Sequence, residues 1–136
     1  MHFLARAIIA GTGVAGLIGP ALAVDMTASE IKAFLSGKTV YLEATSASSS
    51  GQAGQGVIYW AEDGTALYKT ASGAIMHGKW EVKGDTNCTE WKERPNTACV
   101  RYDKIGEVVT VIDTVSGQIR AKVVKTAPGN PEKLAP

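Results

Sequence analysis

The sequence contains few residues that carry acid–base, redox or metal chemistry. It has two histidines and two cysteines among 136 residues, and the cysteines, Cys88 and Cys99, form no C-x-x-C motif. No histidine lies beside either cysteine, which disfavours a redox pair or a zinc site. The pattern therefore predicts no catalytic residue, no metal site and no cofactor.

Neither sign of charge is in excess. The formal net charge is +1, and removal of an N-terminal leader that contains Arg6 would bring it close to zero. Nucleic acids and anionic membranes are bound by clustered Lys and Arg side chains. The balance predicts that nucleic acid is not a partner.

The longest apolar run is too short to serve as a membrane anchor. It extends over about a dozen residues, 7–18, after Arg6, whereas a spanning helix needs about 20. Gly19-Pro20 ends the run, and Ala21-Leu22-Ala23 places small residues at the positions that a signal peptidase reads. We predict that residues 1–23 are a bacterial signal peptide removed after Ala23, which leaves no stable membrane anchor.

The same leader contains a glycine motif that matches a nucleotide-binding fingerprint. Residues 11–16 read G-T-G-V-A-G, which has the G-x-G-x-x-G form. That motif binds a pyrophosphate only between a strand and a helix of a βαβ unit. We therefore expect no nucleotide site here.

The two cysteines are predicted to form a structural disulfide. An exported chain folds in an oxidising compartment, and a small domain gains stability from a covalent link. Closing so short a loop contributes about 2–3 kcal/mol in the chain-entropy model. If Cys88 and Cys99 face each other in a hairpin, Trp91 and Val100 lie on the opposite face from the sulfurs.

The mature chain reads as one short helix followed by β-structure. Thr27-Ala28-Ser29-Glu30 is a capping box, and Gly37 is a helix stop. From Lys38 the hydrophobic period changes to two, and turn residues separate the runs. We expect strands at 39–43, 56–61, 65–70, 74–83, 87–91, 98–103, 107–113 and 118–125. The predicted fold is mainly β: an antiparallel meander, either a small barrel or a curved open sheet, lipocalin-like, in a single domain over residues 24–125.

Two polar segments are predicted not to pack. Residues 45–55 are rich in Ser, Ala and Gly, which indicates a long mobile loop. Residues 126–136 contain three prolines and no apolar period, which predicts a disordered C-terminal tail.

The strand at 74–83 separates into two faces. Met76, Trp80 and Val82 share one side with Gly78, and this side is predicted to face the core. Gly78 between large residues leaves room for a neighbouring ring or for a bend. His77 falls on the opposite, charged face, where we interpret it as a solvated residue.

Aromatic side chains are the candidate ligand-binding residues. Such residues line many binding clefts, but they also fill the cores of small sheet domains. With Tyr59 assigned to the core, Trp60 becomes the best candidate for a pocket or for the surface. The candidates are Tyr59, Trp60, Tyr68, Trp80 and Trp91, with Tyr102 as a further aromatic residue that could line a pocket.

A family resemblance supports this architecture. The order Asp63-Gly64-Thr65, Gly78-Lys79-Trp80-Glu81-Val82, then Cys88, Trp91 and Cys99 resembles a family of small secreted alphaproteobacterial proteins of unknown function. The resemblance covers roughly residues 35–124. It implies a compact lipocalin-like antiparallel sheet and export, and it implies no activity.

Two functions follow as hypotheses. The first is an exported non-enzymatic binding module of the bacterial periplasm or extracellular space, with a small apolar molecule or an envelope protein as its partner. The alternative is an envelope structural or interaction protein, such as an inhibitor or accessory subunit. A sheltered cavity lined by Trp and Tyr favours the first, and a filled core with an exposed apolar patch favours the second. An enzyme would need His77 in a cleft beside a carboxylate or hydroxyl.

Overall fold

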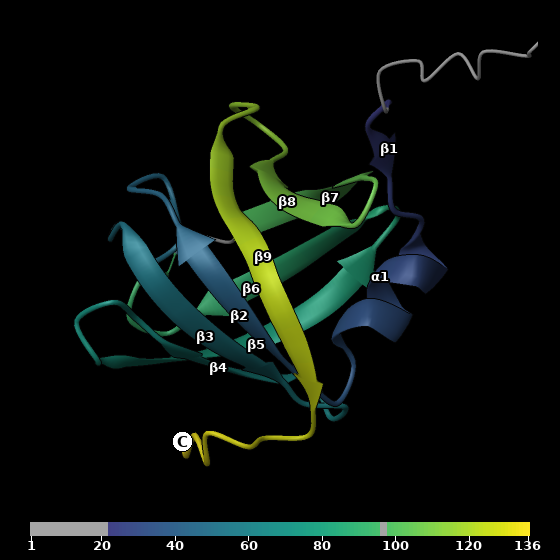
Figure 1. Ribbon diagram of the computed structural model, residues 1–136. Helices are drawn as coiled ribbons and strands as arrows, with labels where there is room; N and C mark the ends of the chain where they lie inside the picture. The colour runs from purple at the N-terminus through teal and green to yellow at the C-terminus, as the bar shows by residue number, and fades with distance from the viewer. Residues whose placement is uncertain (1–21, 96–97) are drawn as a thin grey trace, which may run out of the picture.

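The computed structural model describes residues 22–95 and 98–136 (Figure 1), so most of the predicted signal peptide lies outside the described residues. Its elements, in chain order, are β1 (Val24–Asp25), α1 (Ala28–Leu35), β2 (Lys38–Ala44), β3 (Gly54–Trp60), β4 (Thr65–Lys69), β5 (Ile75–Lys83), β6 (Thr86–Trp91), β7 (Ala98–Ile105), β8 (Val108–Asp113) and β9 (Ile119–Pro128).

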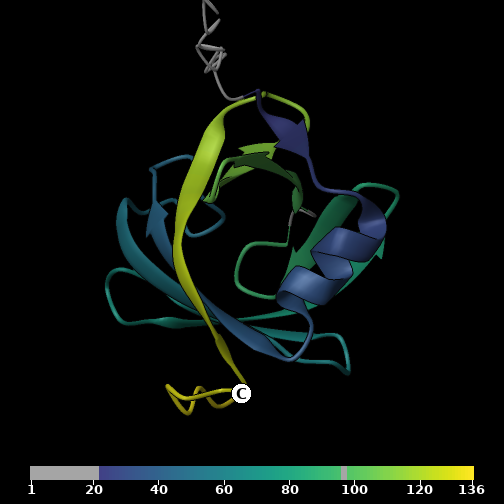
Figure 2. The same ribbon diagram turned by 45° about the vertical axis from the view of Figure 1, so that its right-hand side comes forward.

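Strands β2 to β9 form a closed antiparallel barrel. Consecutive strands pair from β2 to β9, and β9 returns to pair with β2, so the ring has no free gap. Figure 2 gives a view into the barrel between β9 and the strands behind it. The prediction of a mainly β fold is confirmed. Of the two predicted alternatives, a small barrel and a curved open sheet, the structure has the closed barrel, which is consistent with a lipocalin-like architecture.

The predicted strands are all present, and their ends agree within three residues. The predicted β6–β7 register is also confirmed, because Cys88 pairs with Cys99 and Asn87 with Val100. Strand β1 was not predicted. It has two residues, too few for a period, and it extends the sheet by pairing Val24 with Lys104 of β7.

Helix α1 begins at the predicted capping box. The Thr27 hydroxyl accepts a hydrogen bond from the Glu30 amide (3.3 Å), and Glu30 Oε1 accepts one from the Thr27 amide (3.2 Å). Ile31 and Leu35 are fully buried in the barrel core. The Ala28 amide donates to Asp85 in the β5–β6 turn (2.9 Å). The helix therefore packs on the end of the barrel where β2 and β6 begin.

The predicted faces are correct for β5 and incorrect for β3. Met76 is buried and Lys79 is exposed, as expected for β5. In β3, Trp60 is buried whereas Tyr59 lies on the outer, half-exposed side. The assignment of Tyr59 to the core was wrong, because alternation gives the spacing of a face but not which face turns inward.

The two segments predicted not to pack are held by the barrel. Strand β9 continues through the first residues of the tail, pairing Thr126 with Val40, and the Thr39 hydroxyl donates to the Gly129 carbonyl (2.7 Å). Leu134 is only 8% exposed. The prediction of disorder from residue 126 is therefore corrected: β2 needs a partner along its whole length to close the barrel.

The Ser-rich loop between β2 and β3 covers residues 45–53. It is two residues shorter than predicted, because β3 begins at Gly54. Thr45 Oγ1 donates to the Ile119 carbonyl (2.7 Å), and Ser48 is buried. The expectation that this loop would not pack is corrected, since the Thr45 hydroxyl donates to β9 carbonyls and the Ser48 hydroxyl donates to the Gln52 carbonyl within the loop.

Candidate functional site

A cavity of about 50 Å³ lies inside the barrel. Most of its walls are apolar side chains from α1 and the surrounding strands, including Leu35 and Ile58. Three aromatic side chains, Trp60, Tyr68 and Tyr102, complete these walls. A smaller polar group of side chains also lines the cavity: Ser48, Ser49, Thr89 and Arg120.

Arg120 is fixed by an ion pair next to the β2–β3 loop. Its Nε donates to Asp113 Oδ2 (2.9 Å), its Nη2 contacts the same oxygen, and its Nη1 donates to Ser49 Oγ (3.0 Å). The two charged side chains are 16% and 15% exposed. The Ser116 amide and then the Arg120 guanidinium hold the pKa of Asp113 well below its usual range. The charge of Arg120 is therefore already compensated.

Like Trp91, Trp60 is a buried tryptophan whose indole N–H has no hydrogen-bond partner among the described residues. It is 5% exposed, and its Nε1 has no hydrogen-bond partner among the described residues. Trp80 packs edge-on against it (ring centroids 5.6 Å apart), and Trp80 Nε1 donates to the Ala61 carbonyl (2.9 Å). The indole N–H of Trp60 is thus buried, with no acceptor among the described residues, while the Trp60 side chain forms part of the cavity wall.

The other predicted ligand-binding residues divide by position. Tyr68 joins Trp60 in the cavity wall, whereas Tyr59, Trp80 and Trp91 do not line it. Trp80 and Trp91 pack behind Trp60, with the Trp60 and Trp91 ring centroids 6.4 Å apart. The polar lining residues Ser49, Thr89 and Arg120 were not predicted, because no local motif distinguishes them from surface residues.

A second buried polar group supports the cavity wall. Asn87 is fully buried, and its Nδ2 donates to the Tyr102 hydroxyl (3.2 Å). Burial raises the pKa of Tyr102 to about 12. Tyr102 therefore stays neutral over the physiological range.

His77 lies beside a carboxylate in a separate surface groove. Its Nδ1 is 2.5 Å from Glu93 Oε1, and its backbone amide donates to Glu93 Oε2 (2.8 Å). Burial raises the pKa of Glu93, but the hydrogen bonds from His77 outweigh it and leave the pKa below the usual value. The groove has a volume of about 390 Å³, and none of the described residues that line it is a Ser, Thr or Cys. It thus has a histidine oriented by a carboxylate, and no hydroxyl or thiol nucleophile among its described lining residues.

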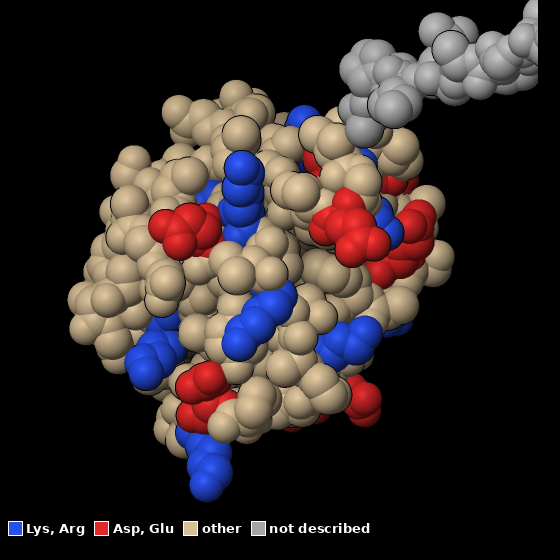
Figure 3. Space-filling model, viewed as in Figure 1, with Lys and Arg blue, Asp and Glu red and all other residues tan. Residues whose placement is uncertain are grey.

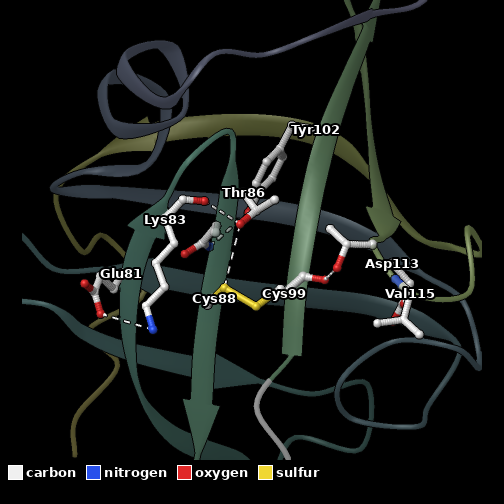
Figure 4. The surroundings of a disulfide bond; sticks show 10 residues. Glu81, Lys83, Thr86, Cys88, Cys99, Tyr102, Asp113 and Val115 are labelled. Carbon is white, nitrogen blue, oxygen red and sulfur yellow. Dashed lines mark hydrogen bonds and ion pairs between the residues drawn. A yellow bond between two sulfur atoms is a disulfide. The ribbon is translucent and has the colours of Figure 1, made fainter.

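The predicted disulfide joins β6 to β7. Figure 4 shows Cys88 and Cys99 bridging the two strands, with the Thr86 hydroxyl 3.7 Å from Cys88 Sγ. Cys88 is buried and Cys99 is half-buried. A disulfide of this kind is consistent with folding in an oxidising environment.

The surface charges are mixed. On the face shown in Figure 3, basic and acidic side chains alternate without a large patch of one sign. Within residues 22–95 and 98–136, no three His, Cys, Asp or Glu side chains are grouped as metal ligands. The same residues contain no helix with the length and apolarity to span a membrane.

Comparison with protein-family models, with curated proteins and with solved structures gives no match to this chain. The resemblance to a secreted alphaproteobacterial family therefore stays a prediction. The site has to be interpreted from its own geometry.

Proposed function

We propose that this protein is an exported, non-enzymatic binding module of the periplasm or extracellular space that holds a small molecule inside its barrel. The observation that carries this proposal is the sheltered cavity with Trp60, Tyr68 and Tyr102 in its wall. Apolar and aromatic walls with a few polar groups are the usual composition of small-molecule sites.

The size of the cavity limits the ligand. About 10–15 Å³ of such space holds one water molecule, so a cavity of about 50 Å³ has room for a molecule of about three to five non-hydrogen atoms. Drug-sized ligands occupy pockets of about 300–1,000 Å³. The proposed ligand is therefore small and largely apolar.

Export is supported by the leader and by the disulfide. The apolar run and the small residues before Val24 have a signal-peptide pattern, and the Cys88–Cys99 link is stable in an oxidising compartment. His77 lies in a groove beside the Glu93 carboxylate, which meets part of what an enzyme would need. The non-enzymatic proposal is supported by the described lining of this groove, which offers no hydroxyl or thiol as a nucleophile.

Mass spectrometry of the protein purified from the envelope fraction of its source cells tests this function. The denatured mass is expected to lack residues 1–23 and two hydrogens. The native mass is expected to exceed the denatured mass by one small ligand, lost on denaturation. A native mass of bare protein would contradict the binding-module proposal, and an intact leader would contradict export.

An envelope interaction protein is the second candidate. Two exposed apolar side chains form a small cluster at the β7–β8 turn, where Ile105 pairs with Val108. An exposed apolar cluster of this kind favours contact with another protein. A native mass that corresponds to a defined complex with a second chain would support this candidate instead.

A further inference from the structure

The two ends of the barrel are covered by different segments of the chain. Helix α1 lies at the end where β2 begins, and its Leu35 forms part of the cavity wall. The β2–β3 loop, residues 45–53, follows the other end of β2, and its Ser48 and Ser49 also line the cavity. Figure 1 shows α1 and this loop at opposite ends of β2. A ligand that reaches the cavity from solvent must therefore pass α1, pass this loop or separate two strands.

Of these three routes, displacement of the β2–β3 loop disrupts the fewest contacts. Helix α1 buries Ile31 and Leu35 fully in the core, and separating two strands breaks the backbone hydrogen bonds that close the barrel. The loop consists of Thr, Ser, Ala, Gly and Gln alone, so it has no large apolar side chain to expose. Segments with few buried apolar contacts are the ones that open locally in native proteins.

Two side-chain hydrogen bonds hold the loop against opposite sides of the barrel end. Arg120 Nη1 of β9 donates to Ser49 Oγ (3.0 Å), and both residues line the cavity. The Ser72 amide in the β4–β5 turn donates to Gln52 Oε1 (3.1 Å). If the loop lifts, Arg120 keeps its ion pair with Asp113, in which Nε lies 2.9 Å from Oδ2. Opening therefore leaves no unpaired charge, and water can replace the bonds that are lost.

We propose that the β2–β3 loop is a lid through which the ligand enters and leaves the cavity, and that the Arg120–Ser49 hydrogen bond is the latch of this lid. The closed lid shelters the ligand, and breaking the latch opens a path to the cavity without disturbing the strands or α1. This inference rests on the proposed function and adds how access to the same cavity is controlled.

The test uses xenon as the probe, because apolar protein cavities bind it. Saturation transfer of the ¹²⁹Xe NMR signal gives the dissociation rate from the mature protein, a titration gives the Kd, and the two together give the association rate. Ser49→Ala is expected to raise both rates about 5- to 10-fold, the loss of one net hydrogen bond. The Kd is expected to change less than about 2-fold, because the closed lid loses this bond whether or not xenon is bound.

A second loop variant breaks the other bond without changing the cavity wall. Gln52→Ala removes the acceptor of the Ser72 amide, and Gln52 does not line the cavity. This variant is also expected to raise both rates by at least about 2-fold, again with a nearly constant Kd.

Two controls separate the lid from general loosening of the protein. Ser46→Ala changes an exposed residue of the same loop, and it is expected to leave both rates within about 2-fold of the unchanged protein. Asp85→Ala removes the acceptor of the Ala28 amide and so loosens α1 at the other end of the barrel. It is also expected to leave both rates within about 2-fold.

Several results would overturn the inference. Faster exchange in Asp85→Ala but not in Ser49→Ala would mean that xenon enters at the α1 end. A weaker Kd with an unchanged association rate in Ser49→Ala would make Ser49 a contact residue and not a latch. Unchanged rates in both Ser49→Ala and Gln52→Ala would mean that the loop is not the entrance. Absence of xenon binding would also overturn the lid, and the native mass would then decide the proposed function separately.

Discussion

Gly78 of β5 lies against the ring of Trp91 on the neighbouring strand β6. The two residues are paired in the sheet, and a Cβ built at Gly78 would be 2.7 Å from Trp91 Cε3. The Thr89 methyl and the Glu90 carbonyl also lie within 3.1 Å of that position. The absence of a side chain at Gly78 is thus what allows Trp91 to fold into the barrel core.

Gly78→Ala is expected to destabilise the protein by about 1–3 kcal/mol, the usual cost of overpacking a core. Urea unfolding measures the change. Lys79→Ala, next in the chain but exposed on the outer face, is expected to change the free energy of unfolding by less than about 0.5 kcal/mol. An equal effect of the two substitutions would contradict the Gly78–Trp91 packing.

Replacement of both Cys88 and Cys99 by serine is expected to lower the free energy of unfolding by about 2–3 kcal/mol, because the unfolded chain regains the entropy of an open loop. Thermal unfolding with and without a reductant gives the comparison. The reductant is expected to destabilise the unchanged protein and to have no effect on the double variant. If the reductant leaves the stability of the unchanged protein and of the double variant the same, the disulfide does not stabilise the fold.

Tyr102 is expected to make the protein sensitive to alkali. Because burial raises its pKa from 10.0 to about 12, its contribution to stability is complete below pH 10 and is lost as the pH rises towards 12, by about 3 kcal/mol in all. Urea unfolding at several pH values between 9 and 12 measures how steeply the free energy of unfolding falls with pH. Tyr102→Phe is less stable at neutral pH, since Asn87 loses its partner, and its unfolding is expected to lack this alkaline component.

Asp113 is expected to make the protein sensitive to acid. Its folded pKa is lowered, so its contribution is present above the unfolded pKa of about 4 and is lost as the pH falls further. Asp113→Asn is expected to lose about 1–3 kcal/mol at pH 7 and to show a weaker acid dependence.

The control for Asp113 is Glu81→Gln. Glu81 pairs with Lys83 at 3.9 Å, but both side chains are more than half exposed, and exposed pairs contribute little. Unfolding curves from pH 7 down to pH 2 are expected to be nearly the same for Glu81→Gln and the unchanged protein. If Glu81→Gln loses as much stability as Asp113→Asn, burial is not what makes the Asp113–Arg120 pair strong.

The features that could be predicted from the sequence are local ones. The capping box at Thr27 and the Gly37 stop define α1, and turn residues such as Asp63-Gly64 separate the strands. The Cys88–Cys99 register followed from the requirement that two sulfurs meet in one hairpin. In each case the interacting groups lie within about a dozen residues of one another, so little loop-closure entropy opposes their contact and it can be recognised from the local sequence.

Other features required the whole barrel. Alternation could not decide whether Tyr59 or Trp60 faces inward, because a strand alone has two equivalent faces until neighbouring strands enclose one of them. The approach of Arg120 to Ser49 joins residues that are 71 positions apart, and the Thr39–Gly129 contact joins residues 90 positions apart. No local signal marks such pairs.

The sequence by itself therefore determined the helix, the order and approximate ends of the barrel strands, and the disulfide register, since these depend on backbone preferences and short-range contacts. Tertiary structure decided that the sheet closes, that the C-terminal residues complete it, and that Trp60 lines a cavity. Closure brings β9 beside β2, which buries one face of every strand at once. The cavity lined by that buried face exists only when all of its walls are in place.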